Sequence, residues 1–458
     1  MNLNRPATTM RIRNGLNLPL KGRPRQVIHK GRAIRHVALC GLDYIGIKPR
    51  LLVSEGDEVG LGQPLFLDKR DPEVPYTSPG RGVVTAIHRG ARRVLQSVVV
   101  RLGDSTAADL EFDPLDDSGF ARLDREQAVE RLRQSGSWSL FRTRPFSRVP
   151  PWGSVPDAVF VTATETRPLA GNPAVIVAGR EQDFIDGLRV LRLLPRKRVF
   201  LCTAPDWHIQ LPEIEGIERS EFLGPHPAGL PGTHIHFLYP VGAERTVWHI
   251  GYQDVIAIGK LFREGVIDTD CVVALGGERI EYPRLVETRR GASTDELMEG
   301  EVRDPDTARL ISGGVLGGRT AAAGLAFLGR YHQQVSAIGE GLDRHFLGWT
   351  GLFPRRYSAA RTFLRMSGHK NRHFISTSQN GRYSGMLPTR AFDKVMPLDI
   401  LPSPLFRALL VKDTDEAQAL GCLELAEDDL ALCSFVCPAK NDYASVLRLN
   451  LAQIEKDG

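Results

Sequence analysis

A glycine-rich stretch in the middle of the chain is the first candidate for chemistry. It reads GPHPAGLPGTHIHF, and Gly224, Gly229 and Gly232 lie where tight turns would need them. Such a loop binds the phosphates of a nucleotide when it opens a helix, because the first backbone amides and the dipole of the helix face the anion. The sequence predicts a strand, HIHFLYPV, directly after this loop. We therefore expect no phosphate or flavin site here.

Histidine is the commonest metal ligand, and four histidines lie in or near this stretch: His226, His234, His236 and His249. Zinc sites add thiolates or a carboxylate at short, regular spacing, and the sequence around these histidines offers neither. On the expected strand, His234 and His236 would point to one face, because side chains repeat every second residue. We expect structural histidines and no metal.

Three cysteines near the C-terminus resemble part of an iron–sulfur site. The stretch CSFVCP reproduces the C-x3-C-P ending of a ferredoxin-type run. A four-iron cluster needs four thiolates, whereas only Cys422, Cys433 and Cys437 are present, in the spacing C-x10-C-x3-C. We interpret them as the relic of a cluster domain that has lost its cluster.

The elements that must position these residues begin with a β domain. Residues 37–103 show short strands separated by glycine turns, in the blocks VSEGDEV, GQPL and SPGRGVV. These blocks resemble biotinyl/lipoyl carrier domains, which are flattened barrel sandwiches. In carriers a hairpin-tip lysine holds the prosthetic group, and Lys69 is the corresponding residue, but the RDPEVP that follows lengthens and stiffens the tip. We expect Lys69 to stay unmodified, because the motif lacks its structural context.

Residues 151–260 are predicted to form a Rossmann-like α/β domain. Four apolar runs, DAVFVTAT, PAVIVAG, RVFLCTA and HIHFLYPV, are expected as strands, with an amphipathic helix over 180–194. Strands that alternate with helices indicate a parallel sheet. Residues 104–150 are expected to be a linker with one helix over 125–134.

The rest of the chain completes a multidomain α/β and β architecture. Residues 1–36 form a basic N-terminal segment, 261–342 are predicted to be a β-grasp-like module, and 343–458 a helical domain that carries the three relic cysteines. The predicted fold is therefore a barrel-sandwich carrier-like domain, a Rossmann-like α/β domain, a β-grasp-like module and a helical C-terminal domain.

Length, composition and cysteine usage exclude several classes of protein. The chain has 458 residues, 42% hydrophobic and 25% charged, which is ordinary for a globular protein of about three domains. No apolar stretch approaches the ~20 residues of a membrane-spanning helix. The N-terminus lacks the apolar core of a secretory signal, and the six cysteines form no disulfide framework. We expect a cytoplasmic protein.

Positive charge is concentrated in two stretches of this chain. Residues Lys21–His36 contain six Lys or Arg and no acid, and Arg344–Arg372 contain seven and no acid. They could face anionic lipid headgroups or acidic loops of a partner, although a solvated face or an interface with another protein is the simpler interpretation. The sequence shows no nucleic-acid-binding signature and no nucleophile-elbow, kinase or H-E-x-x-H motif. We expect no nucleic acid partner and no hydrolase or kinase activity.

Several stretches taken together resemble one family. GLNLP at residues 15–19, the carrier-like domain, GPHPAGLPGTHIHFLYPV, TVWHIGYQDVIAIGKLF, GRYHQQVSAI, VMPLDILPSPLFRALL and LGCLELAEDDLALCSFVCPAKNDY look like the A subunits of the Na⁺-translocating NADH:quinone reductases. The resemblance implies a peripheral position at the cytoplasmic face of the inner membrane, where the chain docks on the membrane-embedded B subunit. It implies a complex whose other subunits carry electrons from NADH through FAD, FMN and iron centres to ubiquinone while pumping Na⁺.

The role implied for this chain is quinone binding and positioning in the ubiquinone-reduction step, together with assembly of the complex. The complex is then the enzyme, and the chain has no catalytic residue and no covalently bound cofactor of its own. We expect His226, His234 and Tyr239 as polar contacts, because histidine and tyrosine can hydrogen-bond a quinone carbonyl. Two alternatives stay open: an electron carrier like the Rnf C subunit, with an iron–sulfur cluster or flavin, and a non-catalytic scaffold. Visible absorption of the pure protein would identify the carrier, and a mass increment on Lys69 would indicate a carrier-type scaffold.

Overall fold

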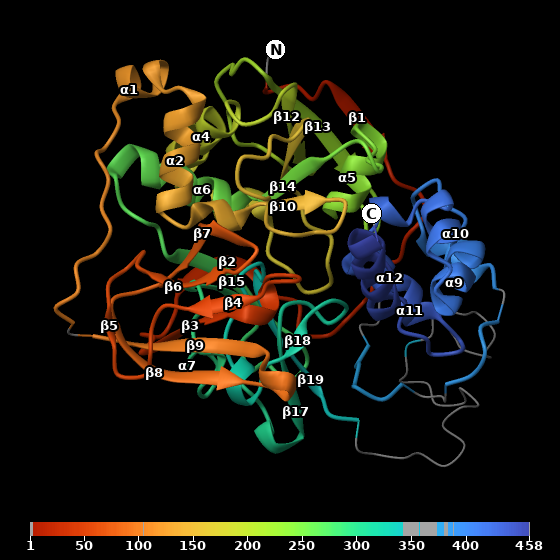
Figure 1. Cartoon of the computed structure of the whole chain (residues 1–458). Helices are drawn as coiled ribbons and strands as arrows, with labels where there is room; N and C mark the ends of the chain where they lie inside the picture. The colour runs from red at the N-terminus through yellow and green to blue at the C-terminus, as the bar shows by residue number, and fades with distance from the viewer. Residues whose placement is uncertain are drawn as a thin grey trace.

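The computed structural model describes residues 3–103, 105–341, 357, 373–379, 383–387 and 389–457. Figure 1 shows a β sandwich from the N-terminal part, an α/β layer above it, a second sheet beside the sandwich and a bundle of helices at the C-terminal end. This arrangement confirms the predicted fold class. The differences from the prediction lie in individual elements.

The N-terminal β domain pairs two small antiparallel sheets. One has the strand order β3-β9-β8-β5 and the other β4-β6-β7. Apolar residues from both sheets, such as Val98 and Phe66, belong to one buried core. The strands are β3 (His36–Cys40), β4 (Pro49–Leu51), β5 (Glu58–Val59), β6 (Pro64–Asp68), β7 (Asp71–Thr77), β8 (Gly82–Arg89) and β9 (Leu95–Leu102).

The hairpin that carries Lys69 is shorter than expected. Asp68 of β6 pairs with Asp71 of β7, which leaves Lys69 and Arg70 as an exposed two-residue tip. The prolines that we expected to lengthen the tip lie within β7 instead, at the edge of a sheet where no donor is required of them. The amide of Lys69 donates to the carbonyl of Lys48 at 2.9 Å, so the tip is bound to the loop before β4.

The second domain is built on a six-stranded sheet of order β1-β13-β12-β11-β14-β10. The first five strands are parallel and β10 is antiparallel. The predicted strands β11 (Ala158–Ala163) and β12 (Arg198–Thr203) are buried apolar runs, as expected of a parallel sheet covered on both faces. The other elements are β1 (Thr8–Arg11), β10 (Arg142–Arg144), β13 (Ile217–Leu223), β14 (Val247–Gly251), α1 (Asp117–Arg122), α2 (Arg125–Gln134), α3 (Pro173–Val177), α4 (Glu181–Leu191), α5 (Pro231–Leu238) and α6 (Tyr252–Glu264).

The order of these strands creates a switch point. The chain places β12 and β13 on one side of β11, and then returns to place β14 on the other side. In open α/β sheets, ligands bind beyond the carboxyl ends of the strands at such a point. The loops after β11 and β14 flank this point, and the loop after β13 lies at the same carboxyl edge of the parallel sheet, so this edge is the first place to examine.

Two of the four expected strands are helices. PAVIVAG forms α3, where the side chain of Asn172 accepts a hydrogen bond from the Ala174 amide at 2.9 Å, and HIHFLYPV lies largely in α5. In both helices proline occupies the first helical position, which it favours because an amide there has no intrahelical partner. The β-branched and aromatic residues suggested strands. The helix-start residues, proline in both helices and Asn172 before α3, favour a helix instead, and the packing of Ile235 against the sheet stabilises α5.

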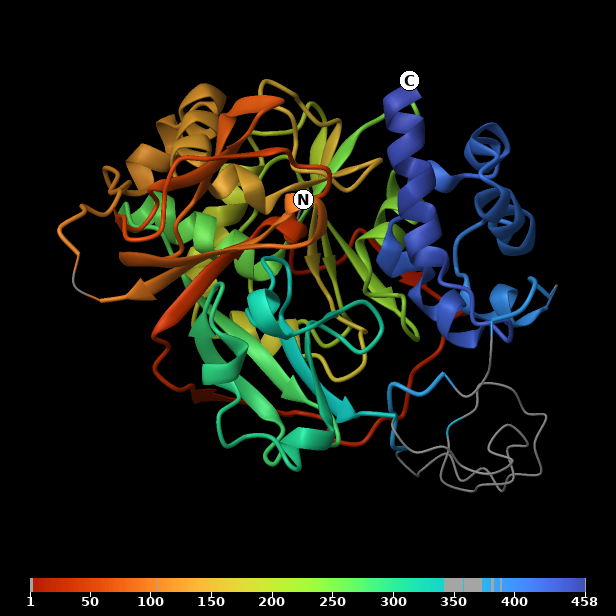
Figure 2. The same ribbon diagram turned by 60° about the horizontal axis from the view of Figure 1, so that its bottom comes forward.

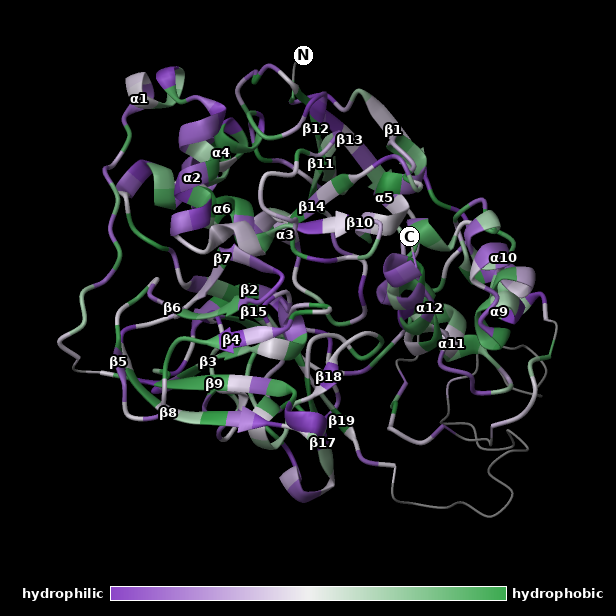
Figure 3. Cartoon of the chain, in the orientation of Figure 1, coloured by the Kyte–Doolittle hydropathy of each residue, from purple (hydrophilic) through white to green (hydrophobic). Residues whose placement is uncertain are grey.

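Segments expected to lie outside the domains contribute strands to them. β10 comes from residues 104–150 and completes one edge of the six-stranded sheet, while β1 from the N-terminal segment forms the opposite edge. The predicted helix over 125–134 is α2, with a capping box at Asp124, and Figure 3 shows that it is mostly hydrophilic on the visible side. Residues 104–150 are thus more than a connection between domains.

The third module is a mixed sheet of order β18-β17-β19-β15-β16-β2. Its edge strand β2 (Arg25–Lys30) comes from the N-terminal basic segment and pairs in parallel with β16. The module's remaining elements are β15 (Asp270–Gly276), β16 (Arg284–Arg289), α7 (Thr294–Leu297), β17 (Ala308–Ser312), β18 (Arg319–Thr320) and β19 (Gln334–Gly339).

The C-terminal domain is helical, as predicted. Phe406 stacks on Tyr443 with ring centroids 4.0 Å apart, and Phe392 meets both rings edge-on, so an aromatic group forms its core. Figure 2 shows the bundle beside the sheets, with the N-terminal segment running along it. The helices are α8 (Ala391–Val395), α9 (Pro402–Val411), α10 (Thr414–Ala419), α11 (Glu427–Val436) and α12 (Tyr443–Asp457). Apart from Tyr357, the basic stretch Arg344–Arg372 lies outside the described residues.

Across the described ranges, none of the helices has both the length and the apolar character needed to cross a membrane.

Candidate functional site

The glycine-rich loop lies at the carboxyl edge of the α/β sheet. The chain leaves β13, passes through Gly224–Leu230 and enters α5 at Pro231. Our expectation that the loop precedes a strand was wrong, and the strand–loop–helix context of a phosphate site is present. The loop also approaches the segment after β11, because the Gly229 amide donates to Thr166 Oγ1 at 2.9 Å.

Two carboxylates from α11 occupy this edge. A Cβ on Gly232, in the first turn of α5, would collide with the carboxylate of Asp429. Arg144 of β10 binds the same carboxylate at 3.1 Å, and the two side chains are only 3% and 2% exposed. The neighbouring Asp428 pairs with Arg167 at 2.8 Å. The residues present therefore do not fit the phosphate of a flavin or nicotinamide nucleotide, because the chain itself fills the position.

The pKa values show how strongly these charges are coupled. Burial alone would raise the pKa of Asp428, but the charge and hydrogen bond of Arg167 hold that pKa at about 2. For Asp429 burial outweighs the charge of Arg144, so its pKa is raised. Burial would lower the pKa of Arg167, whereas Glu165 and Asp428 together raise it. The edge is thus held by one buried ion pair, Arg144–Asp429, and one half-buried ion pair, Arg167–Asp428.

A small hollow of about 240 Å³, here called the edge pocket, opens beside these ion pairs. His226 lines it together with Arg167, Leu230, Leu316 and Asp428. His226 is 2% exposed, and its Nδ1 lies 3.2 Å from Thr166 Oγ1. Of the three residues expected to contact a quinone, His226 lines this hollow, and His234 and Tyr239 line neither it nor the larger hollow described below.

The other two expected contacts lie elsewhere. His234 is fully buried and donates from Nε2 to the carbonyl of Ala228 at 3.0 Å, so it supports the glycine-rich loop from within. Tyr239 lies at the opposite end of α5, where Lys197 donates to its hydroxyl. The structure therefore brings His226 and His234 to the same loop and leaves Tyr239 apart from them.

The histidines do not form a metal site in the described part of the chain, where no group of three or more His, Cys, Asp or Glu side chains could hold a metal ion. His234 and His236 do not share a face, because they lie on a helix: His234 packs on Phe222 and His236 binds Glu424 at 2.8 Å. Our expectation of a common face was wrong.

Burial sets the protonation of three of these histidines. It lowers the pKa of His226 and of His234 to about 3, with the positive charge of Arg167 acting in the same direction. It also lowers the pKa of His249 well below its usual value, assisted by Arg142 and Arg144. All three rings are neutral at physiological pH.

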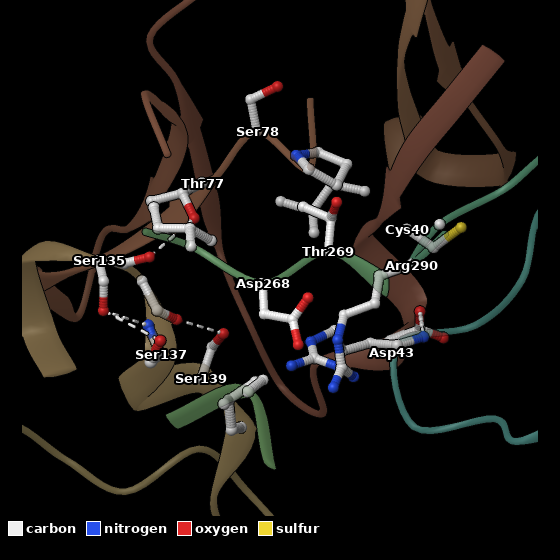
Figure 4. Close-up of a pocket in the computed structure, with 18 of the residues that line it drawn as sticks. Cys40, Asp43, Thr77, Ser78, Ser135, Ser137, Ser139, Asp268, Thr269 and Arg290 are labelled. Atoms are coloured by element: carbon white, nitrogen blue, oxygen red, sulfur yellow. Dashed lines mark hydrogen bonds between the residues drawn. The ribbon is translucent and has the colours of Figure 1, made fainter. Parts of the chain in front are cut away.

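A larger hollow, here called the junction pocket, lies where three domains meet. It encloses about 730 Å³, open solvent at its mouth included. β3 lines it from the β sandwich, residues 135–140 and α6 line it from the α/β domain, and Arg290 and Arg330 come from the third module. Figure 4 shows Ser135 and Ser137 on one side, Arg290 and Asp43 on the other, and Asp268 between them.

The charged groups around the junction pocket are paired among themselves. Asp254 accepts from Arg290 at 2.6 Å and from Arg330 at 3.2 Å. The amide of Arg330 donates to Asp43 at 2.7 Å, and Asp268 pairs with Arg180 at 2.8 Å. These pairs fix the guanidinium groups in place as hydrogen-bond donors at the wall of the pocket.

The junction pocket combines apolar walls with hydroxyl groups. Its apolar lining includes Leu39, Tyr44, Leu140, Leu261, Ile267 and Leu328, and its hydroxyls include those of Ser78, Ser135, Ser137 and Thr269. An apolar pocket with a few convergent polar groups is typical of a site for a small organic molecule. The lining thus offers apolar walls and hydrogen-bonding groups side by side.

No sequence pattern indicated the junction pocket. Its lining comes from segments between residues 38 and 330, and no spacing in the sequence encodes their meeting. A partial signal was present in SGSWSL, residues 135–140, a cluster of small polar residues around a tryptophan in a segment that we took for a linker.

The three relic cysteines are packed as core residues. Cys422, Cys433 and Cys437 are buried in the core of the helical domain, and Cys437 Sγ lies 3.4 Å from the Tyr443 hydroxyl. Burial raises the pKa of Cys422 to about 12. This packing supports their interpretation as a cluster relic, which stays a prediction, as does the unmodified state of Lys69.

Comparison with protein families gives three matches, one after another along the chain. Residues 10–103 match the NqrA N-terminal barrel-sandwich hybrid domain, residues 123–267 the NqrA second alpha/beta domain, and residues 272–323 the NQRA C-terminal domain. The matches coincide with the sandwich, the α/β domain and part of the third module.

Curated relatives match almost end to end. The A subunit of the Na(+)-translocating NADH-quinone reductase of Pseudomonas aeruginosa is 51% identical over 98% of this chain and 100% of its own length. The proteins of the same name from Neisseria meningitidis and Rhodopirellula baltica are 49% and 48% identical, each over 98% of this chain and over 100% and 98% of their own lengths. Among solved structures, an NAD+-reducing [NiFe]-hydrogenase in the air-oxidized state covers 47% of each chain at 12% identity with a TM-score of 0.34.

Proposed function

The chain belongs to the NqrA family, the A subunits of Na⁺-translocating NADH-quinone reductases, and we propose that it binds and positions ubiquinone for reduction by its partner subunits. Reduction of a quinone needs two electrons and two protons. In this proposal the electrons come from FAD, FMN and iron centres of other subunits, and NADH is oxidised there. This chain supplies a shaped pocket and hydrogen-bond donors.

The junction pocket is the observation that carries the proposal. A quinone presents a flat apolar ring with a carbonyl oxygen at each end, and each oxygen accepts a hydrogen bond. Leucine side chains line the pocket for the ring, while serine hydroxyls and the Arg290 guanidinium lie on opposite sides for the two oxygens. The ion pair with Asp254 orients Arg290 before any ligand enters, which lowers the entropic cost of binding.

The edge pocket is the second candidate. Its single advantage is His226, which is neutral and could donate to or accept from a quinone oxygen. The edge pocket is the smaller of the two hollows, at about 240 Å³ against about 730 Å³, with open solvent included in both. We therefore place the quinone in the junction pocket, and keep His226, His234 and Tyr239 as residues to be tested.

We further propose peripheral attachment at the cytoplasmic face of the inner membrane through the membrane-embedded B subunit. The basic segment Lys21–His36 suits acidic loops of a partner or anionic headgroups. Part of its charge is already used inside the chain, since Arg32 pairs with Glu299 at 3.3 Å and Arg35 with Glu296 at 3.7 Å. Because charge is partly neutralised, we expect a packed interface to dominate attachment. Complete release from membranes by salt alone would contradict this expectation.

Omission of this chain from the complex tests the proposed function. Membranes that contain the other subunits should still oxidise NADH with an artificial acceptor that takes electrons from the flavins, and should lose ubiquinone reduction. Adding the purified chain back should restore it. Unchanged ubiquinone reduction and Na⁺ transport without the chain would refute the proposal.

A further inference from the structure

The carboxyl edge of the α/β sheet holds an anion that belongs to the chain itself. The fold places a glycine-rich loop and the start of α5 after β13, and a strand–loop–helix arrangement of this kind presents the first amides of a helix to an anion such as phosphate. The carboxylate of Asp429 lies against Gly232 in the first turn of that helix. A side chain from a different domain has thus taken the place of a ligand.

The groups around the Asp429 carboxylate stabilise its negative charge. Its Oδ2 accepts from the Ala426 amide at 2.8 Å, directly before α11, so the carboxylate lies between the starts of two helices. Arg144 donates to it at 3.1 Å, and the Nε of Arg144 is buried with no hydrogen-bond partner among the described residues. Two helix dipoles and a guanidinium therefore act on one anion.

The absence of a side chain at Gly232 allows the Asp429 carboxylate to approach the backbone of α5 closely. Because glycine has no Cβ, the Asp429 carboxylate can reach the backbone of α5, and a methyl group there would collide with it. A simple ion pair between Arg144 and Asp429 would not require a glycine at this position. The close approach to backbone is the feature that resembles a phosphate-binding loop.

We propose that Asp429 is a built-in anionic ligand that closes the helix start after the glycine-rich loop, and that a small external carboxylate takes the same position when the Asp429 side chain is removed. The ligand class of the vacated site is a small monoanion, with formate as the size-matched probe. With Asp429 in place, this loop has no room for the phosphate of a nucleotide.

Chemical rescue tests this proposal. In Asp429→Ala, the carboxylate is replaced by space beside Arg144, and we expect a lower midpoint of urea unfolding than in the wild type. Sodium formate should raise that midpoint relative to sodium chloride at equal ionic strength. At about ten times its dissociation constant, formate should change the unfolding equilibrium constant about tenfold, because it binds the folded state alone.

Two matched variants separate this mechanism from general salt effects. Asp429→Asn removes the charge but keeps the space filled, so formate should not rescue it. Asp186→Ala also removes a buried carboxylate, but its partners Arg189 and Arg263 are 32% and 25% exposed and can be solvated without a ligand. Formate should leave the midpoint of urea unfolding of Asp186→Ala unchanged relative to chloride. Equal rescue of Asp186→Ala, or no rescue of Asp429→Ala, would overturn the proposal.

Folding and nucleotide binding supply further readouts. If Asp429→Ala does not fold in chloride, refolding in formate should restore the near-ultraviolet circular dichroism of the native protein, and failure in both salts counts against the proposal. The wild-type chain should leave the fluorescence of FMN unchanged at micromolar concentration. Saturable quenching of FMN that inorganic phosphate competes away would show an open phosphate site and overturn the closure.

Discussion

Three buried histidines should make the stability of the α/β domain fall steeply as the pH is lowered. His226, His234 and His249 are at most 3% exposed, and burial lowers the pKa of each, to about 3 in the first two. In the unfolded chain each returns to an ordinary value of about 6.5. Below that pH the unfolded state binds protons that the native state does not bind, so stability decreases as pH falls through about 6.5.

The magnitude follows from the two pKa values of each histidine. Between about pH 7.5 and about pH 5.5 each histidine reduces the free energy of unfolding by about 1.4 kcal/mol. The three together reduce it by about 4 kcal/mol, a large part of the ~5–15 kcal/mol of a typical domain.

Urea unfolding at several pH values measures this effect. The fluorescence of buried Trp138 and Trp248 and of half-buried Trp152 reports on the domain, because Trp152 and Trp248 pack on Trp138 with ring centroids 5.3 and 5.1 Å away and lose that packing on unfolding. In His234→Gln the loss over the same pH range should shrink by about 1.4 kcal/mol. His29→Gln, at an exposed position on β2, is the matched control and should keep the wild-type dependence. If the free energy of unfolding of His234→Gln depended on pH as strongly as that of the wild type, His234 would not be the source of this share of the pH dependence.

Three further outcomes are expected from packing. Gly259→Ala should destabilise the chain by about 2–3 kcal/mol in urea unfolding, because the added Cβ collides with the carbonyl of Asp183 where α6 crosses α4; an unchanged midpoint would contradict this close crossing. Phe406→Ala removes the ring stacked on Tyr443 and should cost about 3–5 kcal/mol, with faster hydrogen exchange confined to α8–α12; faster exchange throughout the sheets would show that the helical domain is not a separate unit. Burial raises the pKa of Cys40 to about 12, so this thiol should react with a disulfide reagent only after unfolding, and rapid reaction of the native protein would contradict its burial.

The sequence predicted the fold class better than it predicted individual helices. The strands β11 and β12 were found because a parallel sheet covered on both faces requires uninterrupted apolar runs. The same criterion failed for α3 and α5, which are short, buried helices rich in β-branched or aromatic residues. Proline at the first position of each helix was the available signal, and it is a stronger guide there than periodicity.

The candidate site could be predicted only in part. The glycine-rich loop and His226 were identified, because residue type and local spacing carry that information. The Asp429 carboxylate that fills the loop lies about two hundred residues further along the chain, and the junction pocket draws on three domains. Contacts of this kind arise from tertiary packing and have no local signature.

Quinone turnover by a complex with a filled junction pocket tests whether the quinone binds in this pocket. Thr269→Phe places a ring at a half-buried position of the lining, and Thr320→Phe makes the same change at an exposed position of β18. With Thr269→Phe, ubiquinone reduction should fall at least tenfold while NADH oxidation by an artificial flavin acceptor is unchanged, a loss equivalent to about 1.4 kcal/mol or more in the activation barrier. Thr320→Phe should leave both rates at the wild-type level. Normal ubiquinone reduction by Thr269→Phe, in a complex that retains this chain, would mean that the quinone does not bind in the junction pocket.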